Sequence, residues 1–297
     1  MKKNKAYKFR LMPNKTQANL IERTIGCARF IYNCMLADKI KHYKDTKLSL
    51  KNTPAQYKKE YEFLKEVDSL ALANAQMNLE AAYSNFFRRV KQGKKEFGFP
   101  KFKSKKKCSW SYTTNNQKDS IRIENNKMKL PKIGFVKLIQ HREIPNDYII
   151  KSVTVSKTRT NKYYISILVE YETQVIKKDI EKVIGLDFSM KELYVDSTGY
   201  SANYPRFFRH AQEKLAKEQR KFSHRKPGSK RYEKQRLKVA KIHEHIANQR
   251  KDLLHKESHK LANAYDMVCV EDLNMQAMSQ CLNFGKSVAD NGWGMFR

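Results

Sequence analysis

Apolar and polar side chains alternate at the start of the chain. Tyr7, Phe9 and Leu11 are each separated by one basic residue, which is the period-two pattern of a strand with one buried face. A Pro-Asn pair then ends the run. We expect Thr16 to cap the helix that follows, because apolar residues recur at steps of three and four as far as about Lys41.

A second helical periodicity covers residues 69–90, and we group both helices into a helical domain at 13–92. After Gly93 the pattern changes to short β-rich runs between turn residues, which predicts an antiparallel barrel or sandwich over 93–175. We expect the first strand, residues 1–12, to belong to the same barrel. The runs are 97–102, 108–114, 120–123, 127–130, 135–139, 149–156 and 162–171.

The last region, 176–297, combines strands with long charged helices. A Lys-Pro-Gly breaker separates the two helices, which predicts a helical hairpin over 205–264. The predicted elements are strands at 183–189 and 193–196, helices at 206–223 and 229–263, and a final strand at 267–273.

Two acids lie in these apolar strands. Asp187 is within the run VIGLDFS, and Glu271 ends the run MVCVE. An acid inside an apolar strand is unfavourable unless it is hydrogen-bonded, paired or bound to a cation. A hydrogen-bonded Asp and an ordinary strand-end Glu are the simpler explanations. Carboxylates from adjacent strands can instead hold Mg²⁺, and two such ions stabilise the attacking and leaving oxygens of a phosphodiester during hydrolysis.

The charge of the chain indicates its partner. Of 297 residues, 61 are Lys or Arg and 30 are Asp or Glu, which gives a formal net charge of +31. A charge of this size attracts polyanions. Because it is spread over segments of different type, it favours nucleic acid over an anionic membrane surface.

Composition also excludes several classes of protein. A hydrophobic content of 40% supplies packed cores and argues against wholesale disorder. No apolar run is long enough to span a membrane and no signal segment is evident, so we expect a cytoplasmic protein without a membrane partner. The five Cys are scattered without a C-x-x-C pair, which argues against a disulfide framework and a zinc ribbon.

Six segments together carry a family resemblance. They are YKFRLMPNKTQ, ARFIYN, GFPKFKSKKKCSWSYTTNN, GLDFSMKELYVDSTGYSANYPRFFR, NQRKDLLHKESHKLANAYDMVCVEDLNMQAM and KSVADNGWGMFR. In this order they resemble the TnpB family of insertion-sequence-encoded, RNA-guided DNA nucleases, formerly called OrfB-type transposases and related to type V CRISPR effectors. The resemblance covers essentially the whole chain.

The resemblance implies an α+β multidomain fold. A wedge-type antiparallel β-barrel with an inserted helical recognition domain would be followed by a RuvC nuclease domain of RNase H-like fold, with a long basic helical hairpin. The implied partners are a guide RNA and a matched double-stranded DNA target. Asp187 matches the first RuvC carboxylate and Glu271 the second, both as catalytic Mg²⁺ ligands.

The chain departs from the family pattern after Glu271. Family members carry a four-Cys zinc ribbon and a third metal-binding Asp further along, and neither occurs before Arg297, 26 residues on. Asp290 has the right chemistry in a different context, and Asp196 and Asp272 are also poor substitutes. We therefore expect an incomplete RuvC domain, an incomplete Mg²⁺ site, no bound zinc, and absent or very weak cleavage.

Basic and aromatic residues are interleaved over residues 84–107, with ten Lys or Arg against one Glu. Such cations neutralise phosphates and release counterions, and exposed aromatic rings stack on unpaired bases. The Phe residues fit a hydrophobic core equally well. The selected nucleic-acid contacts are Arg88, Arg89, Lys101 and Lys103.

The predicted hairpin is the second basic track. Residues 205–260 contain 18 Lys or Arg and six Asp or Glu, an excess that suits the backbone of an RNA-containing duplex. A solvated hairpin would have a similar pattern. His255 and His259, four residues apart, are interpreted as part of a polar face and not as zinc ligands. The selected contacts are Arg206, Arg209, Arg220, Arg225 and Lys226.

The first segment, YKFRLMPNKTQ, resembles the part of the family that meets a short duplex motif beside the target. Polar side chains there can reach base edges or phosphates, although Asn14 also fits a simple turn. The selected residues are Tyr7, Lys8, Arg10, Asn14, Gln17 and Asn33.

Three functions fit the sequence. The first is a guided DNA nuclease. The second is a nuclease-deficient RNA-guided DNA binder that acts by occupancy, for example as a repressor, and the third is a decayed fragment of an active nuclease. We expect RNA-guided DNA binding, with Mg²⁺-dependent cleavage weakened by the missing third carboxylate.

Overall fold

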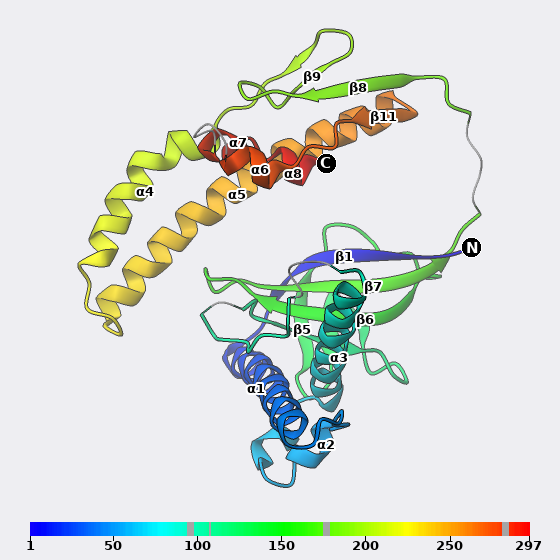
Figure 1. Cartoon of the computed structure of the whole chain (residues 1–297), viewed down its shortest axis with the longest axis vertical. Coiled ribbons are helices and arrows are strands. Elements are labelled where there is room, and N and C mark those ends of the chain that lie inside the picture. Colours follow the sequence, from blue (N-terminus) through cyan, green and yellow to red (C-terminus); the bar gives the residue numbers. More distant parts are fainter. Residues whose placement is uncertain (94–97, 107, 175–178, 281–284) are drawn as a thin grey trace. The chain divides into compact units, whose positions relative to one another are not determined.

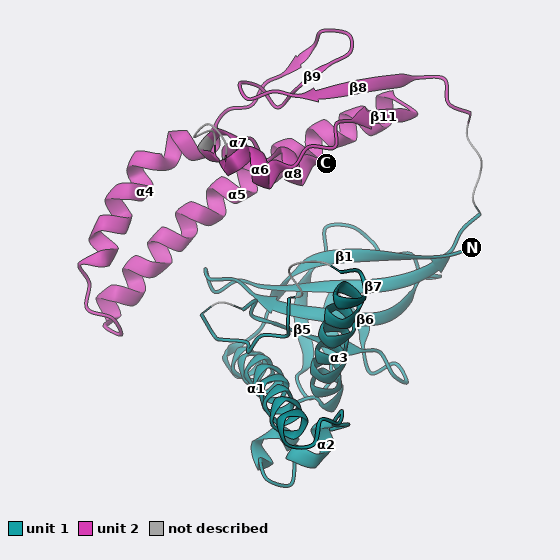
Figure 2. Ribbon diagram, in the orientation of Figure 1, with its two compact units in different colours: residues 1–175 teal, residues 176–297 magenta. Residues whose placement is uncertain are grey.

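The computed structural model describes residues 1–93, 98–106, 108–174, 179–280 and 285–297. The chain divides into two compact units, residues 1–175 and 176–297, which are coloured separately in Figure 2. Each unit has hydrophobic core residues of its own. No helix in the described ranges is long and apolar enough to cross a membrane.

Unit 1 contains a seven-stranded sheet in which every pairing is antiparallel (Figure 1). Its order is β2-β6-β7-β1-β5-β4-β3, so the strand at the start of the chain lies in the middle of the sheet. The strands are β1 (Lys2–Met12), β2 (Ser111–Asn115), β3 (Arg122–Glu124), β4 (Lys127–Leu130), β5 (Gly134–Ile139), β6 (Ile149–Lys157) and β7 (Tyr163–Glu172).

The sheet curls around one hydrophobic core. The alternation in β1 buries Tyr7, Phe9 and Leu11, and these meet inward-facing residues from both ends of the sheet, including Tyr112 of β2 and Met128 of β4. Among the described residues β2 and β3 remain the sheet edges, with no pairing between them. The strands therefore form a curled antiparallel sheet with two edges, which confirms the predicted antiparallel sheet, and its assignment as a wedge-type barrel stays a prediction.

The helices of unit 1 lie between β1 and β2 in the sequence. They are α1 (Lys15–Thr46), α2 (Pro54–Tyr57), the 3₁₀ helix η1 (Glu62–Lys65) and α3 (Ser69–Lys91). Met35 and Leu36 of α1 pack with Leu72 and Leu79 of α3 in a second hydrophobic cluster. Because α1 and α3 also supply Ile21, Ile25 and Ala71 to the core of the sheet, these helices belong to the same compact unit.

The cap of α1 differs from the predicted one. Asn14, and not Thr16, precedes the first helical turn: its side chain accepts a hydrogen bond from the Gln17 N–H (2.8 Å), and the Gln17 side chain accepts one from the Asn14 N–H (3.1 Å). This reciprocal capping box satisfies two backbone donors that the helix cannot. At the other end α1 continues past Lys41 to Thr46, where Lys47 adopts a left-handed conformation.

One predicted strand is wrong. The run 97–102 forms no strand at residues 98–102, and Phe97 lies outside the described residues. Gly98 has a φ of +64° and Pro100 lacks an N–H group, and both features interrupt a strand ladder. The segment is a loop whose backbone at Lys103 is held by both ends of the Asn33 amide.

Unit 2 combines a four-stranded sheet with a long helical hairpin (Figure 1). The sheet order is β10-β9-β8-β11, and only the β8–β11 pairing is parallel. The strands are β8 (Val183–Phe188), β9 (Tyr194–Asp196), β10 (Ser201–Ala202) and β11 (Met267–Val270). The helices are α4 (Phe207–Ser223), α5 (Lys230–Ala264), α6 (Met275–Gln280), α7 (Gly285–Asn291) and α8 (Trp293–Phe296).

The core of unit 2 joins the sheet to the second arm of the hairpin. Ile184 and Leu186 of β8 pack with Leu254 and Leu261 of α5 and with Trp293, all of them buried. The remaining length of α4 and α5 is largely polar, which fits their high content of charged residues.

The central position of β1 makes its buried face a test of the fold. Replacing Phe9, which is 1% exposed, by Ala should lower the free energy of unfolding by about 3–5 kcal/mol, because the truncation leaves a cavity in the core. Ile139 on β5 is 49% exposed, and Ile139→Ala should change it by less than about 0.5 kcal/mol. Urea unfolding of both variants measures the difference; equal effects would contradict the described core.

Candidate metal centre and nucleic-acid surfaces

The parallel pairing of β8 and β11 brings Asp187 and Glu271 together. Leu186 lies opposite Val270 in the register, and the two acids are the next residues of their chains. Strands that run in the same direction end at the same edge of a sheet, so both carboxylates project from one edge. Acids far apart in the sequence thereby become neighbours.

Both acids are exposed. In β8 the alternation buries Ile184 and Leu186, and Asp187 therefore faces away from the core. Glu271 directly follows β11 and is also exposed. Burial of an acid in an apolar strand is thus the wrong reason to single out Asp187, because strand periodicity places it on the open face.

The two carboxyl groups lie close enough to affect each other's protonation. A hydrogen bond with Asp187 raises the pKa of Glu271 above its ordinary value of 4.5; desolvation and the charge of Asp187 act in the same direction, and a hydrogen bond to the Phe188 backbone opposes them. A hydrogen bond between two carboxyl groups requires a proton on one of them. In the fully ionised pair, a cation would take over the role of that proton.

The donor set fits a hard divalent cation. Carboxylate oxygens are the ligands that Mg²⁺ prefers, and the exposed pair leaves room for water and phosphate oxygens beside it. Within the described ranges, no group of three or more His, Cys, Asp and Glu side chains is placed to hold a metal. The pair therefore stands without a third protein carboxylate there.

The other acids considered as ligands are engaged elsewhere. Asp196 accepts hydrogen bonds from Thr198 and Tyr200 in its own turn. Asp272 forms an ion pair with Arg297. Asp290, in α7, is buried against the start of α4, where it accepts a hydrogen bond from the Phe208 N–H.

His255 and His259 are exposed on α5, and the ring of His259 makes a hydrogen bond to Asn263 (3.0 Å).

The residues selected on β1 lie on different faces. Tyr7 is buried in the core of unit 1, so its side chain is not available for the contact predicted for it. Lys8 and Arg10 point to the other face, where their charged groups lie 5.2 and 5.6 Å from the centre of the Tyr164 ring. These two cations with an intervening aromatic ring remain a predicted phosphate or base contact.

The selected amides have structural partners. Asn14 and Gln17 form the capping box of α1, and the Gln17 amide also donates to the Phe135 carbonyl (2.8 Å). The Asn33 amide donates to the Lys103 carbonyl (2.9 Å) and accepts from its N–H (2.8 Å). Their role in base recognition stays untested, but each has a local role that the sequence pattern did not reveal.

The basic residues around α3 are mostly open to solvent. Arg88, Arg89 and Lys101 are exposed. Lys103 is half-buried, with its ammonium 3.9 Å from the centre of the Tyr32 ring, and desolvation lowers its pKa. Lys103 is therefore held more tightly than a solvated lysine.

The basic residues selected on the hairpin are exposed. They are Arg206, Arg209, Arg220, Arg225 and Lys226. The Arg209 guanidinium also donates to the Ser287 hydroxyl (2.6 Å).

The sequence reasoning missed a basic stripe on α5. Arg231, Lys234, Lys238 and Lys241 line, together with Arg225, a hollow of about 570 Å³ beside the start of α5 and the turn that precedes it. Steps of three, four and three residues put the four α5 side chains on one helix face, and that spacing could have identified them.

Comparison with known proteins shows the family. A model of the OrfB type described as "Probable transposase" matches residues 166–282. One curated relative, from Streptomyces pristinaespiralis, is 31% identical over 99% of this chain and 73% of its own length. Another, from Escherichia coli (strain K12), is 30% identical over 99% of this chain and 76% of its own length. Both are named "Putative RNA-guided DNA endonuclease", with the addition InsQ for the second.

The chain belongs to the TnpB family. A further model described as "Helix-turn-helix domain" matches residues 1–47, although this TnpB family member forms strand β1 and the single long helix α1 there. Among solved structures, the chain resembles the protein of a Cas12f1–sgRNA–target DNA complex with a TM-score of 0.51 at 14% identity, over 95% of this chain and 71% of that one. That likeness supports the mixed α/β fold.

The contact between the two acids predicts a specific titration. With a pKa raised in the folded chain, Glu271 holds more protons folded than unfolded, so the stability from this pair declines as the pH rises through the folded value. Asp187→Asn removes the repelling charge and should lower the pKa of Glu271 toward its ordinary value. Carbon-13 NMR titration of the Glu271 carboxyl measures it. Asp272→Asn serves as the control that leaves it unchanged; the same value in wild type and Asp187→Asn would contradict the contact.

Proposed function

We propose that this protein is an RNA-guided DNA endonuclease, which binds a guide RNA and cleaves a matched DNA target. The observation that carries the proposal is the pair of adjacent carboxylates, Asp187 and Glu271, at the edge of the unit 2 sheet. They occur in a chain that aligns along 99% of its length with relatives named as RNA-guided DNA endonucleases.

The two units would have different functions, recognition in unit 1 and cleavage in unit 2. The curled sheet of unit 1 would be the wedge domain, made of residues 1–12 and 93–175, and the helices in 13–92 would recognise the duplex beside the target. Unit 2, residues 176–297, would be a RuvC-like nuclease domain of RNase H-like fold. The parallel β8–β11 pair beside an antiparallel strand supports this assignment.

Asp187 and Glu271 would hold Mg²⁺. When bound, the ion supplies a Lewis acid that stabilises negative charge on the oxygens of a phosphodiester. The two residues must both be ionised for this role. Two adjacent negative charges repel each other, and a bound cation relieves that repulsion. Their exposure at a sheet edge leaves them accessible to a nucleic-acid strand.

The helical hairpin would bind the guide–target duplex through its phosphates. Its 18 basic residues against six acidic ones in residues 205–260 provide a strongly positive surface. The stripe on α5 that faces the hollow adds cations at helical spacing. Such a surface reads the shape and charge of an A-form duplex, and sequence is read by base pairing.

A nuclease-deficient binder that acts by occupancy is not favoured by the comparisons, since both curated relatives carry an endonuclease name. It remains distinguishable by experiment. Guided binding without cutting would identify it.

The test uses the full chain co-expressed with its flanking DNA, so that the copurifying RNA can be sequenced and used as a guide. The complex should bind a matched duplex and cut it in Mg²⁺, slowly because the described residues supply no third carboxylate to the pair. Asp187→Ala and Glu271→Ala should each reduce the cleavage rate by about 100-fold or more, because metal catalysis supplies several kcal/mol of transition-state stabilisation. Their binding of the target should change little.

Asp272→Ala is the matched control, since this neighbouring acid pairs with Arg297 and not with Asp187. It should retain most of the cleavage rate. Wild-type cleavage that persists in Asp187→Ala, or the absence of any copurifying RNA, would contradict the proposed function.

A further inference from the structure

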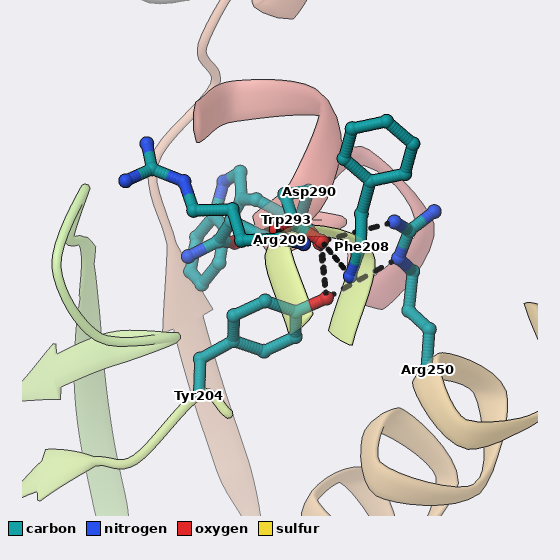
Figure 3. A network of polar contacts seen from close by, with 7 residues as sticks. Tyr204, Phe208, Arg209, Arg250, Asp290 and Trp293 are labelled. Atoms are coloured by element: carbon teal, nitrogen blue, oxygen red, sulfur yellow. Dashed lines mark hydrogen bonds and ion pairs between the residues drawn. The ribbon is translucent and has the colours of Figure 1, made fainter. Parts of the chain in front are cut away.

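Asp290 is a buried carboxylate that the candidate metal centre does not use. It is 3% exposed and lies in α7. Figure 3 shows it among Tyr204, Phe208 and Arg250. Its oxygens accept hydrogen bonds from the N–H groups of Phe208 (3.1 Å) and Arg209 (3.3 Å) and an ion pair from Arg250 (3.3 Å). The Tyr204 hydroxyl donates to its backbone carbonyl. A single acid thus joins three segments.

The contacts with Phe208 and Arg209 replace a missing helix cap. Arg206 is the N-cap residue of α4, has a φ of +50° and makes no side-chain cap bond. The first N–H groups of a helix have no partner within it, and a carboxylate there also suits the positive end of the helix dipole. Asp290 supplies that carboxylate from α7 and, through Arg250, ties the start of α4 to α5.

Asn291, the next residue, contacts the loop after β8 and not the hairpin. It is 2% exposed, and its amide donates to the carbonyls of Ser189 (3.0 Å) and Glu192 (2.5 Å). Those carbonyls belong to the loop that directly follows β8. Ser189 is two residues from Asp187, so Asn291 fixes the loop next to the first carboxylate of the candidate site.

The next residues complete this arrangement. Gly292 has a φ of +78°, and a Cβ there would lie 2.9 Å from the Cδ atom of Arg250, so the chain needs glycine at this turn. The turn places the fully buried ring of Trp293 against Phe188, with 5.9 Å between ring centres. Phe188 is the neighbour of Asp187. Two successive contacts therefore hold the end of β8.

We propose that residues 290–293, here called the clasp, position Asp187 for metal binding by tying the end of β8 to the base of the basic hairpin. This inference rests on the proposed function. Asp290 and Asn291 act through Asp187 and are positioning residues, since they do not contact the carboxyl pair. An exposed acid at a strand end has few packing contacts of its own, and the clasp supplies the rigidity that a metal ligand needs.

The test compares Asn291→Ala with Asn263→Ala. Asn263 is exposed on α5 and bonds only His259 among the described contacts of its side chain, so it controls for loss of an Asn hydrogen bond in the same unit. Two readouts are used on the full chain: hydrogen exchange of residues 188–193, and the Mg²⁺ concentration that gives half of the maximal rise in bound Mg²⁺, measured by isothermal titration calorimetry. Neither needs nuclease activity.

Asn291→Ala should speed exchange in residues 188–193 by about tenfold and raise the half-maximal Mg²⁺ concentration by about tenfold, and excess Mg²⁺ should restore the full rise. Asn263→Ala should match the wild type in both. If Asn291→Ala does not fold, Asn291→Ser, which keeps one hydroxyl donor, should show a smaller change in the same direction.

A lower melting temperature with an unchanged Mg²⁺ midpoint would overturn the proposal, because the clasp would then support the fold alone. A wild-type chain without any Mg²⁺ response would also overturn it. If the wild type responds to Mg²⁺ but cuts no guided target, the proposed function fails. The role of the clasp in positioning Asp187 is then still tested by the hydrogen exchange and the half-maximal Mg²⁺ concentration.

Discussion

The parallel pairing of β8 with β11 is the constraint on which unit 2 depends. Parallel neighbours cannot be joined by a tight turn, so the chain must make a long crossover between them. Here the crossover contains β9, β10 and the hairpin of α4 and α5. The parallel pairing therefore places Asp187 beside Glu271. The long connection that it requires contains the basic hairpin.

The charges of the chain indicate what binds to this arrangement. A net charge of +31 disfavours a compact chain unless anions bind to it, and the basic residues of the hairpin and those described in 84–93 and 98–106 are largely exposed. The carboxyl pair is a local exception, where two acids lie in contact. A nucleic acid would neutralise the cations, and a divalent metal ion would neutralise the pair and bring a phosphate to it.

Much of the fold could be predicted from the sequence. Strand alternation in β1 and helical periodicity in α3, α4 and α5 identified those elements to within one or two residues at most ends, because their buried faces follow simple periods. Two predictions failed for local reasons. The predicted strand 97–102 is absent at residues 98–102 because Gly98 has a positive φ and Pro100 lies nearby. Thr16 is not the cap because Asn14 forms the capping box of α1. Both depend on backbone geometry that hydrophobic periodicity does not record.

The candidate site was predictable only in part. Asp187 and Glu271 could be identified by resemblance, whereas burial in an apolar strand was the wrong reason for Asp187, and their proximity required the register of two distant strands. Tyr7 was misjudged because an amphipathic ring fits a core as well as a nucleic acid. The structural partner of Asn33 could not be foreseen because Lys103 is remote in sequence, and a nucleic-acid contact at Asn33 stays a prediction. The clasp could not be foreseen, since Asp290 meets α4 and α5 only after the chain has folded.

The central claim is that Asp187 and Glu271 bind one metal ion together, and Mn²⁺ binding followed by electron paramagnetic resonance tests it most directly. The wild type should show a site that Asp187→Asn, Glu271→Gln and the double variant all lose to the same extent, because two ligands of one ion are strongly coupled. Independent, additive losses, or equal Mn²⁺ binding by the wild type and the double variant, would contradict the account.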